Sequence, residues 1–492
     1  MRAAMIGVVS LSLLAALGFS FWPEAERPGS DHHWIEKDAA PEKSGPAGTG
    51  ETLVDVGGPD IGGTILVDDG EIGGQLPHIP DTPEKLLANA KPKSEQVEKA
   101  LAYLANQQHK DGGWGQGGGW RTGGQQGGRV EGPNVEDPSD VGNTCIAALA
   151  FLRAGNTPTK GKYAEHLARA VDFICKNVEN ADAESLHVTP VRNTQLQSKI
   201  GPYIDTFLAA QVLAELKDQA PSPEKEKRLL AALSKTIDKM AKHQQQDGTW
   251  SREGWAAVFS QGVAIKSLNQ AALKNVPVPK QVLVRAENWA QAQAKLQQSG
   301  AAAPGARLGV AGGYGGGFGG MSAPASADAG IALYSASNIA AGLQQAGQSN
   351  SGKKERIKAA IARADTPEPD REEAKQDLAR IEATEQVYDA QRALLVDQVS
   401  NPQFVRGFGS NGGEEFLSYL NISEVLHEKG GKPWEKWDRH VAALLSHAQD
   451  RDGSYSGHHC ITGKTFCTSA AVLVLLADQA PKVATAKPEP KK

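Results

Sequence analysis

A loop of one form recurs three times in this chain, and it constrains the fold more than any other feature. The copies are QQHKDGGWG at 107–115, HQQQDGTWS at 243–251 and HAQDRDGSYSG at 447–457. Each follows an amphipathic helix, presents Asp-Gly and then an aromatic residue, and precedes an apolar helix. Recurrence in one structural context is typical of repeat proteins, in which neighbouring units bury each other's apolar faces. The glycine permits a positive φ at a tight corner, and the aromatic ring can pack between helices.

From Ser94 onward apolar residues recur with the helical period, and the predicted helices form two alternating sets. One set is amphipathic and charged and suits an outer ring: 94–109, 161–178, 222–246, 279–297, 372–399 and 433–449. The other set is apolar on nearly all sides and suits an inner ring: 140–155, 199–217, 254–274, 326–347, 413–429 and 465–479. Six helical hairpins are the number that closes an α6/α6 toroid. We therefore predict an all-α toroid domain over 93–480, with a charged helical insertion at 349–372.

The N-terminal segment 1–22 predicts export. It carries Arg2 and then no charged residue from Ala3 to Trp22, which fits a cleaved signal peptide and a membrane anchor equally well. Either would place the rest of the chain on the periplasmic or extracellular side. The composition of 23–92 predicts a low-complexity linker with short strands in 52–75, and 481–492 predicts a disordered tail. The formal charge of −5 gives no indication of nucleic-acid binding.

The loops that lead from the outer to the inner helices should gather at one end of the toroid. Several are long and rich in glycine, notably GGWGQGGGWRTGGQQGG and GVAGGYGGGFGGMS. Long loops inside a compact domain are commonly functional or disordered. We predict that four aromatic residues in these loops line a ligand cavity: Trp114, Trp120, Tyr314 and Phe318.

The recurring loops resemble the QW motif of squalene and hopene cyclases, which protein prenyltransferase β-subunits share in weaker form. The resemblance covers about 94–480, is best in 107–155 and 447–477, and is greatest to exported members of this repeat superfamily. It implies a toroid with a cavity between the inner helices, where some members bind isoprenoid chains. It also implies a purely structural role for the following loop residues: Gln107, Asp111, Trp114, Gln245, Asp247, Trp250, Gln449, Asp452 and Tyr455.

Squalene-hopene cyclases protonate an alkene with the middle aspartate of a DxDD motif, and this chain has VEDPSDVGNT at 135–144 instead. The remaining catalytic candidates are carboxylates near the starts of inner helices: Asp140, Asp205 and Asp328. Capping of the free N–H groups of those helices is the alternative interpretation. With Glu253, Glu414 and Glu415, the residues Asp205 and Asp328 could ring the cavity entrance with carboxylates. Glycosidases and polysaccharide lyases with an α/α barrel place acids and bases in such positions.

Protein prenyltransferases hold Zn²⁺ with Asp, Cys and His, and the C-terminal block of this chain falls where they supply the histidine. Here Cys467 precedes Thr468 at that point, so the order of ligands differs. The densest run of metal-binding residue types comprises His458, His459, Cys460 and Cys467. Three interpretations stay open: a Cys460–Cys467 disulfide in an oxidising compartment, a Zn²⁺ site at the toroid mouth, and thiols with surface histidines.

The sequence as a whole predicts an exported toroid that binds an apolar or peptide ligand in the cell envelope, without cyclase chemistry. The alternative function is an enzyme that uses the same cavity on isoprenoids or, with carboxylates at the rim, on polysaccharide. The fold carries most of this inference, and a fold does not fix a function.

Overall fold

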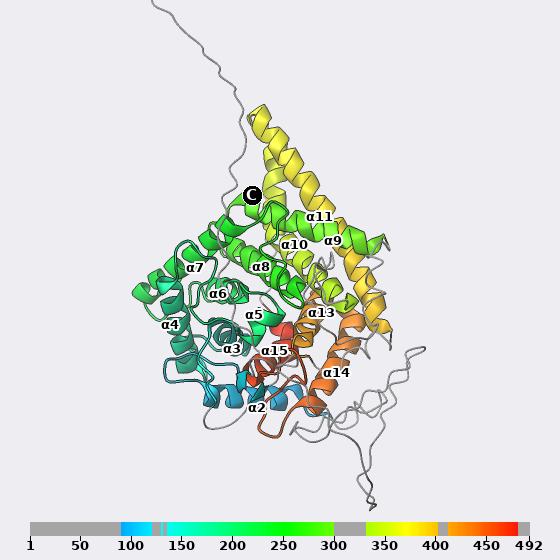
Figure 1. Cartoon of the computed structure of the whole chain (residues 1–492). Coiled ribbons are helices and arrows are strands. Elements are labelled where there is room, and N and C mark those ends of the chain that lie inside the picture. Colours follow the sequence, from blue (N-terminus) through cyan, green and yellow to red (C-terminus); the bar gives the residue numbers. More distant parts are fainter. Residues whose placement is uncertain (1–89, 121–128, 131–134, 300–330, 402–411, 481–492) are drawn as a thin grey trace, which may run out of the picture. The chain divides into compact units, whose positions relative to one another are not determined.

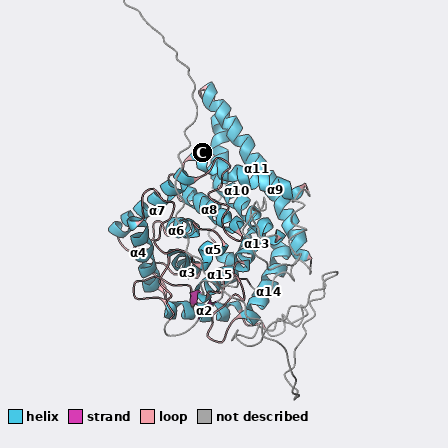
Figure 2. Ribbon diagram, viewed as in Figure 1, coloured by secondary structure: helices cyan, strands magenta, loops and turns pink. Residues whose placement is uncertain are grey.

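The computed structural model describes residues 90–120, 129–130, 135–299, 331–401 and 412–480. This part of the chain is all-α (Figure 2). It contains thirteen α-helices, one 3-10 helix and an antiparallel ribbon of two short strands. The ribbon pairs β1 (Gly119–Trp120) with β2 (Arg129–Val130). No helix among these residues is long and apolar enough to cross a membrane. The predictions for 1–22, most of 23–92, Tyr314, Phe318, Asp328 and 481–492 lie outside the described residues.

The helices fall into the two predicted sets, with ends within a few residues of the predicted ranges except at α10 and α6. The outer set has one charged face and comprises α2 (Lys93–Gln107), α4 (Ala164–Asn180), α7 (Pro223–His243), α9 (Lys280–Gln298), α11 (Glu368–Ser400) and α14 (Gly431–Ala448). The inner set is apolar and comprises α3 (Val141–Arg153), α6 (Ile204–Glu215), α8 (Ala257–Leu273), α10 (Ala332–Ala362), α13 (Glu415–Lys429) and α15 (Lys464–Leu475). A 3-10 turn, η2 (Ala477–Gln479), follows α15.

Contacts between the inner helices form a closed series. Each inner helix packs against the next in sequence, and the last packs against the first: α3 on α6, α6 on α8, α8 on α10, α10 on α13, α13 on α15, and α15 on α3 (Figure 1). Each outer helix packs against at least one inner helix. The inner helices are therefore covered on several sides, which explains why they are apolar on nearly all faces. We call the end at which the inner helices begin the mouth.

The three recurring loops share one set of hydrogen bonds. In each, the Asp side chain accepts from a backbone N–H two residues later at 3.0 Å. In each, the Asp-following glycine has φ near +90° and lies against a backbone carbonyl of the neighbouring outer helix, so that a Cβ there would come within 2.3 to 2.6 Å of that oxygen. The indole N–H of Trp114 donates to the Leu104 carbonyl (2.8 Å), and that of Trp250 donates to the Met240 carbonyl (2.7 Å). The two tryptophans therefore fasten the first two corners to the helix before each, whereas the Tyr455 hydroxyl of the third corner donates to the Gln96 side chain of α2 (3.3 Å).

The repeating glutamine is displaced by one residue from its predicted position in two of the loops. Gln108, Gln244 and Gln449 each donate to the carbonyl of the Asp-following glycine and to a carbonyl of the adjacent outer helix. Gln107 and Gln245 are exposed neighbours of these residues. The assignment of Gln107 and Gln245 as the repeating glutamines is therefore wrong, whereas that of Gln449 agrees with the geometry.

Two helical features differ from the sequence prediction. The stretch 349–372 is continuous with its flanking helices, since α10 runs on to Ala362 and α11 begins at Glu368. The predicted helix 199–217 is interrupted at Gly201, whose φ is +153°, and a short helix, α5 (Gln195–Lys199), precedes α6. A side chain at Gly201 would press on Ser260 of α8, so this position needs a glycine.

Candidate functional site

Two carboxyl groups are buried close together where α3 and α6 begin. Asp140 caps α3, where its two oxygens accept from the backbone N–H (2.8 Å) and the side-chain amide (2.9 Å) of Asn143. Asp205 reaches the same turn and accepts from the Gly142 N–H (2.9 Å) and the Gln197 amide (2.8 Å). Both residues are 1% exposed. We call Asp140 and Asp205 the carboxyl pair.

Burial keeps a proton on the carboxyl pair at neutral pH. Burial raises the pKa of Asp140 to about 8, and the nearby Asp205 carboxylate adds to this shift. Burial also raises the pKa of Asp205, against the hydrogen bonds donated by Gln197 and Gly142. A carboxylic acid in this state can act as a proton donor. All four oxygens of the carboxyl pair nevertheless accept hydrogen bonds from the protein, so the geometry agrees with the capping interpretation.

Helix α5, which the sequence analysis missed, covers this end of the inner helices. A capping box between Thr194 and Gln197 fixes it, and the Thr-x-x-Gln spacing is a signal that could have predicted it. The side-chain oxygen of Gln195 accepts from the backbone N–H groups of Thr462 (2.7 Å) and Gly463 (3.0 Å), just before α15. These bonds join segments more than 260 residues apart in sequence and hold the mouth together.

A cavity of about 30 Å³ lies between the inner helices, among described side chains. It is lined by residues from all six inner helices, including Leu149, Leu208, Val263, Ala341, Leu417 and Leu473. This volume holds about one water molecule. The described residues therefore leave no room for an isoprenoid chain at this position.

Four buried charged residues form a group that we call the axial ion cluster: Arg153, Glu215, Lys266 and Glu424. Two of them, Arg153 and Lys266, line this cavity. The Arg153 guanidinium lies 3.2 Å from one oxygen of Glu424 and 4.0 Å from an oxygen of Glu215, and the Lys266 ammonium pairs with the other Glu424 oxygen. Burial opposes ionisation of Glu424, but Lys266 and Arg153 outweigh it and lower the pKa of this carboxyl group. Two positive and two negative groups balance, which indicates a structural role.

Glu414, His459 and Cys460 bring a carboxylate, an imidazole and a thiol together at the mouth. One potential ligand atom from each lies within 4.8 Å of the other two. Glu414 directly precedes α13, and the other two residues lie in the loop before α15. The Gly413 N–H donates to the Ile461 carbonyl (3.0 Å) and fastens the two segments to each other. We call these three residues the Glu414 cluster; of the four predicted metal ligands it contains only His459 and Cys460.

None of the four cysteines, all of which lie in the described part of the chain, forms a disulfide. The predicted Cys460–Cys467 bond is therefore not formed in this structure. The two side chains have different neighbours: the Cys467 thiol donates to the Ile461 carbonyl (3.6 Å), whereas Cys460 belongs to the Glu414 cluster. Burial raises the pKa of Cys460 to about 12, and the Glu414 carboxylate adds to this. At neutral pH this thiol is protonated and is a poor nucleophile.

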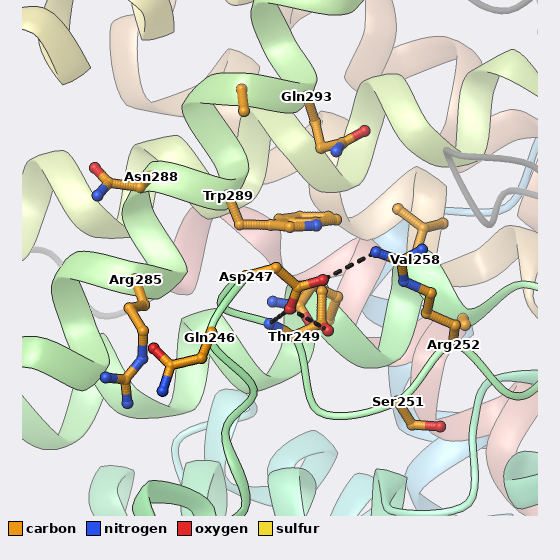
Figure 3. A pocket seen from close by; sticks show the side chains of 13 residues that line it. Gln246, Asp247, Thr249, Ser251, Arg252, Val258, Arg285, Asn288, Trp289 and Gln293 are labelled. Atoms are coloured by element: carbon orange, nitrogen blue, oxygen red, sulfur yellow. Dashed lines mark hydrogen bonds and ion pairs between the residues drawn. The ribbon is translucent and has the colours of Figure 1, made fainter.

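A groove of about 370 Å³ lies beside the second recurring loop, between that loop, the start of α8 and α9 (Figure 3). We call it the second-loop groove. Figure 3 shows the Trp289 ring over Asp247, with Arg252 and Arg285 on either side of that carboxylate in this view. The other polar residues that line the second-loop groove are Gln246, Thr249, Ser251, Gln261, Asn288 and Gln293. Partial burial opposes ionisation of Asp247, but hydrogen bonds from Thr249 and Arg252 lower its pKa overall.

Of the predicted cavity-lining aromatics, Trp114 has a described side chain, and its position differs from the prediction. Trp114 is completely buried and packs against Phe151, with ring centroids 5.9 Å apart, so it serves the core instead of a cavity. Trp120 lies in β1. Trp289, which lies in a predicted outer helix, was not among the predicted site residues. Its place in the i, i+3, i+4 pattern resembles that of a core residue, so only the groove itself identifies it.

No protein-family profile matches the chain, and no curated protein matches it in sequence. The resemblance to squalene cyclases and prenyltransferases therefore still depends on the recurring loops alone.

Proposed function

We propose that this chain is an exported α6/α6 toroid of the squalene-cyclase and prenyltransferase repeat group that binds a peptide in the second-loop groove. The closed series of contacts among the six inner helices supports the toroid. The hydrogen-bonding of the three loops supports a common repeat unit. Export is proposed from residues 1–22 and is tested by fractionating cells that express the tagged full chain.

The observation that carries the binding proposal is the difference in size between the described interior cavity and the second-loop groove. The interior cavity of about 30 Å³ is too small for a lipid chain, whereas the groove of about 370 Å³ is in the size range of ligand sites. Its amide, hydroxyl and guanidinium groups match the donors and acceptors of a peptide backbone. The Trp289 ring offers one face for an apolar side chain. A peptide therefore fits this lining better than an isoprenoid does.

The test is binding of a library of blocked hexapeptides to the full chain, with farnesol as the apolar comparison probe. We expect saturable binding of a subset of peptides and none of farnesol. Trp289→Ala should weaken the best peptide by about 30-fold, the loss typical of an aromatic anchor. Trp255→Ala is the matched control, because Trp255 is 53% exposed and does not line the groove. Absence of saturable peptide binding, or peptide binding that Trp289→Ala leaves unchanged, would refute the peptide groove.

A further inference from the structure

The Glu414 carboxylate is buried with one oxygen unsatisfied. The residue is 1% exposed, and its Oε1 accepts from the Tyr334 hydroxyl at 3.4 Å. Its Oε2 is buried and has no hydrogen-bond partner. Leaving a buried charged oxygen without a partner is costly, so such an atom in a native protein calls for a proton, a water molecule or a cation. The carboxylate is also confined, since a Cβ on Gly412 would lie 2.5 Å from its Oε1.

Cys460 is held in a conformation that its residue type disfavours. Its φ is +56°, in the left-handed region that costs a residue with a Cβ about 1–2 kcal/mol. Strained backbone of this kind persists where the surroundings enforce it, and it collects at functional sites. Here the neighbouring Ile461 carbonyl is bonded to the Gly413 N–H (3.0 Å), and Gly412 and His459 form a backbone bridge. These contacts fix the thiol on the same side as the Glu414 carboxylate.

The donor set suits zinc. Zn²⁺ prefers thiolate, imidazole and carboxylate ligands in tetrahedral geometry, with bonds of about 2.0–2.3 Å. Such bonds place neighbouring ligand atoms about 3.3–3.8 Å apart. The three candidate atoms already lie within 4.8 Å of one another, and His459 is exposed and able to approach. A cation there would satisfy Glu414 Oε2 and replace the proton of the Cys460 thiol, which is released to solvent.

We infer that Glu414, His459 and Cys460 hold one Zn²⁺ ion at the mouth, with the fourth coordination position open to water or another small donor. This ligand set differs from the one that the prenyltransferase resemblance implied, because Cys467 is outside it and a carboxylate before α13 is inside it. None of its members lines the second-loop groove, so the zinc site and the peptide groove stand or fall separately.

The experiment measures metal content and affinity in the purified full chain. The chain is stripped with a chelator, equilibrated with Zn²⁺ alone, dialysed and analysed by elemental mass spectrometry. We expect one zinc per chain, and with Co²⁺ in place of zinc a thiolate-to-metal charge-transfer band in the near ultraviolet. Glu414→Gln and Cys460→Ser should each weaken zinc binding by at least about 100-fold, since losing even an outer partner of a ligand costs about 10–100-fold. Cys460→Ser should also abolish the charge-transfer band.

His458→Ala is the matched control, because His458 adjoins the cluster in sequence without belonging to it, and it should bind zinc as the wild type does. His459→Ala, at an exposed position, serves as the second ligand variant should Glu414→Gln fail to fold. Absence of stoichiometric zinc at micromolar free metal would overturn the inference. So would full zinc binding by Cys460→Ser, or equal losses in His458→Ala and His459→Ala.

Discussion

The two ends of the inner helices hold buried carboxyl groups in opposite electrostatic settings. Away from the mouth, Glu215 and Glu424 face Arg153 and Lys266 in the axial ion cluster, and the charges balance. At the mouth, none of Asp140, Asp205 and Glu414 forms an ion pair within the described part of the chain. The carboxyl pair retains a proton there, and Glu414 keeps an unsatisfied oxygen. One end is therefore electrostatically complete, whereas the other end is suited to take up a proton or a cation.

Breaking the balance in the axial ion cluster should have the largest effect. Glu424→Ala leaves Arg153 and Lys266 buried without their shared partner, which should lower the free energy of unfolding by about 3–5 kcal/mol. Denaturant unfolding of the purified chain measures it. Glu95→Ala removes a carboxylate from an exposed pair with Lys99 and should leave stability almost unchanged. Equal stability of Glu424→Ala and wild type would show that the cluster does not stabilise this end.

Substituting the Asp-following glycine of a recurring loop should destabilise the fold at the mouth. Gly248→Ala combines a positive φ (+88°) with a Cβ placed 2.3 Å from the Arg285 carbonyl, and should cost about 2–4 kcal/mol. Gly155→Ala measures the cost of the positive φ alone, because the φ of Gly155 is +81° but nothing lies within 4 Å of the added Cβ. Thermal unfolding compares the two variants. If Gly155→Ala is as destabilising as Gly248→Ala, close packing of the corner on α9 has no part in the effect.

A smaller effect should come from the ring that fastens the second corner. Trp250→Phe removes the hydrogen bond to the Met240 carbonyl and shortens a side chain that is 4% exposed, at a cost of about 1–2 kcal/mol. Trp255→Phe changes an indole that is 53% exposed and should have little effect. Chemical denaturation measures the free energy of unfolding of both variants. Equal losses of stability in Trp250→Phe and Trp255→Phe would show that the buried corner ring has no special role.

The sequence predicted the helices well because their apolar periodicity is long and regular, and the Asp-Gly-aromatic corners are local signals. Gln107 and Gln245 were predicted in place of Gln108 and Gln244, because the choice depends on which amide reaches a carbonyl of the next outer helix. The axial ion cluster escaped prediction for a similar reason. Arg153 and Lys266 meet Glu424 across 271 and 158 residues of sequence, and each looks like a solitary charge in an apolar helix. The Glu414 cluster could not be predicted either, because Glu414 lies near His459 and Cys460 only through the packing of α13 on α15.

The pH dependence of stability tests the central contrast between the two ends most directly. In the carboxyl pair the folded pKa of Asp140 lies above its ordinary value, so between the two values the folded chain binds more protons than the unfolded chain. The free energy of unfolding should therefore fall as pH rises from about 5 to about 8, by up to about 1.4 kcal/mol per pH unit. Asp140→Asn should remove most of this slope. Parallel pH profiles for wild type and Asp140→Asn would contradict a proton held at the mouth.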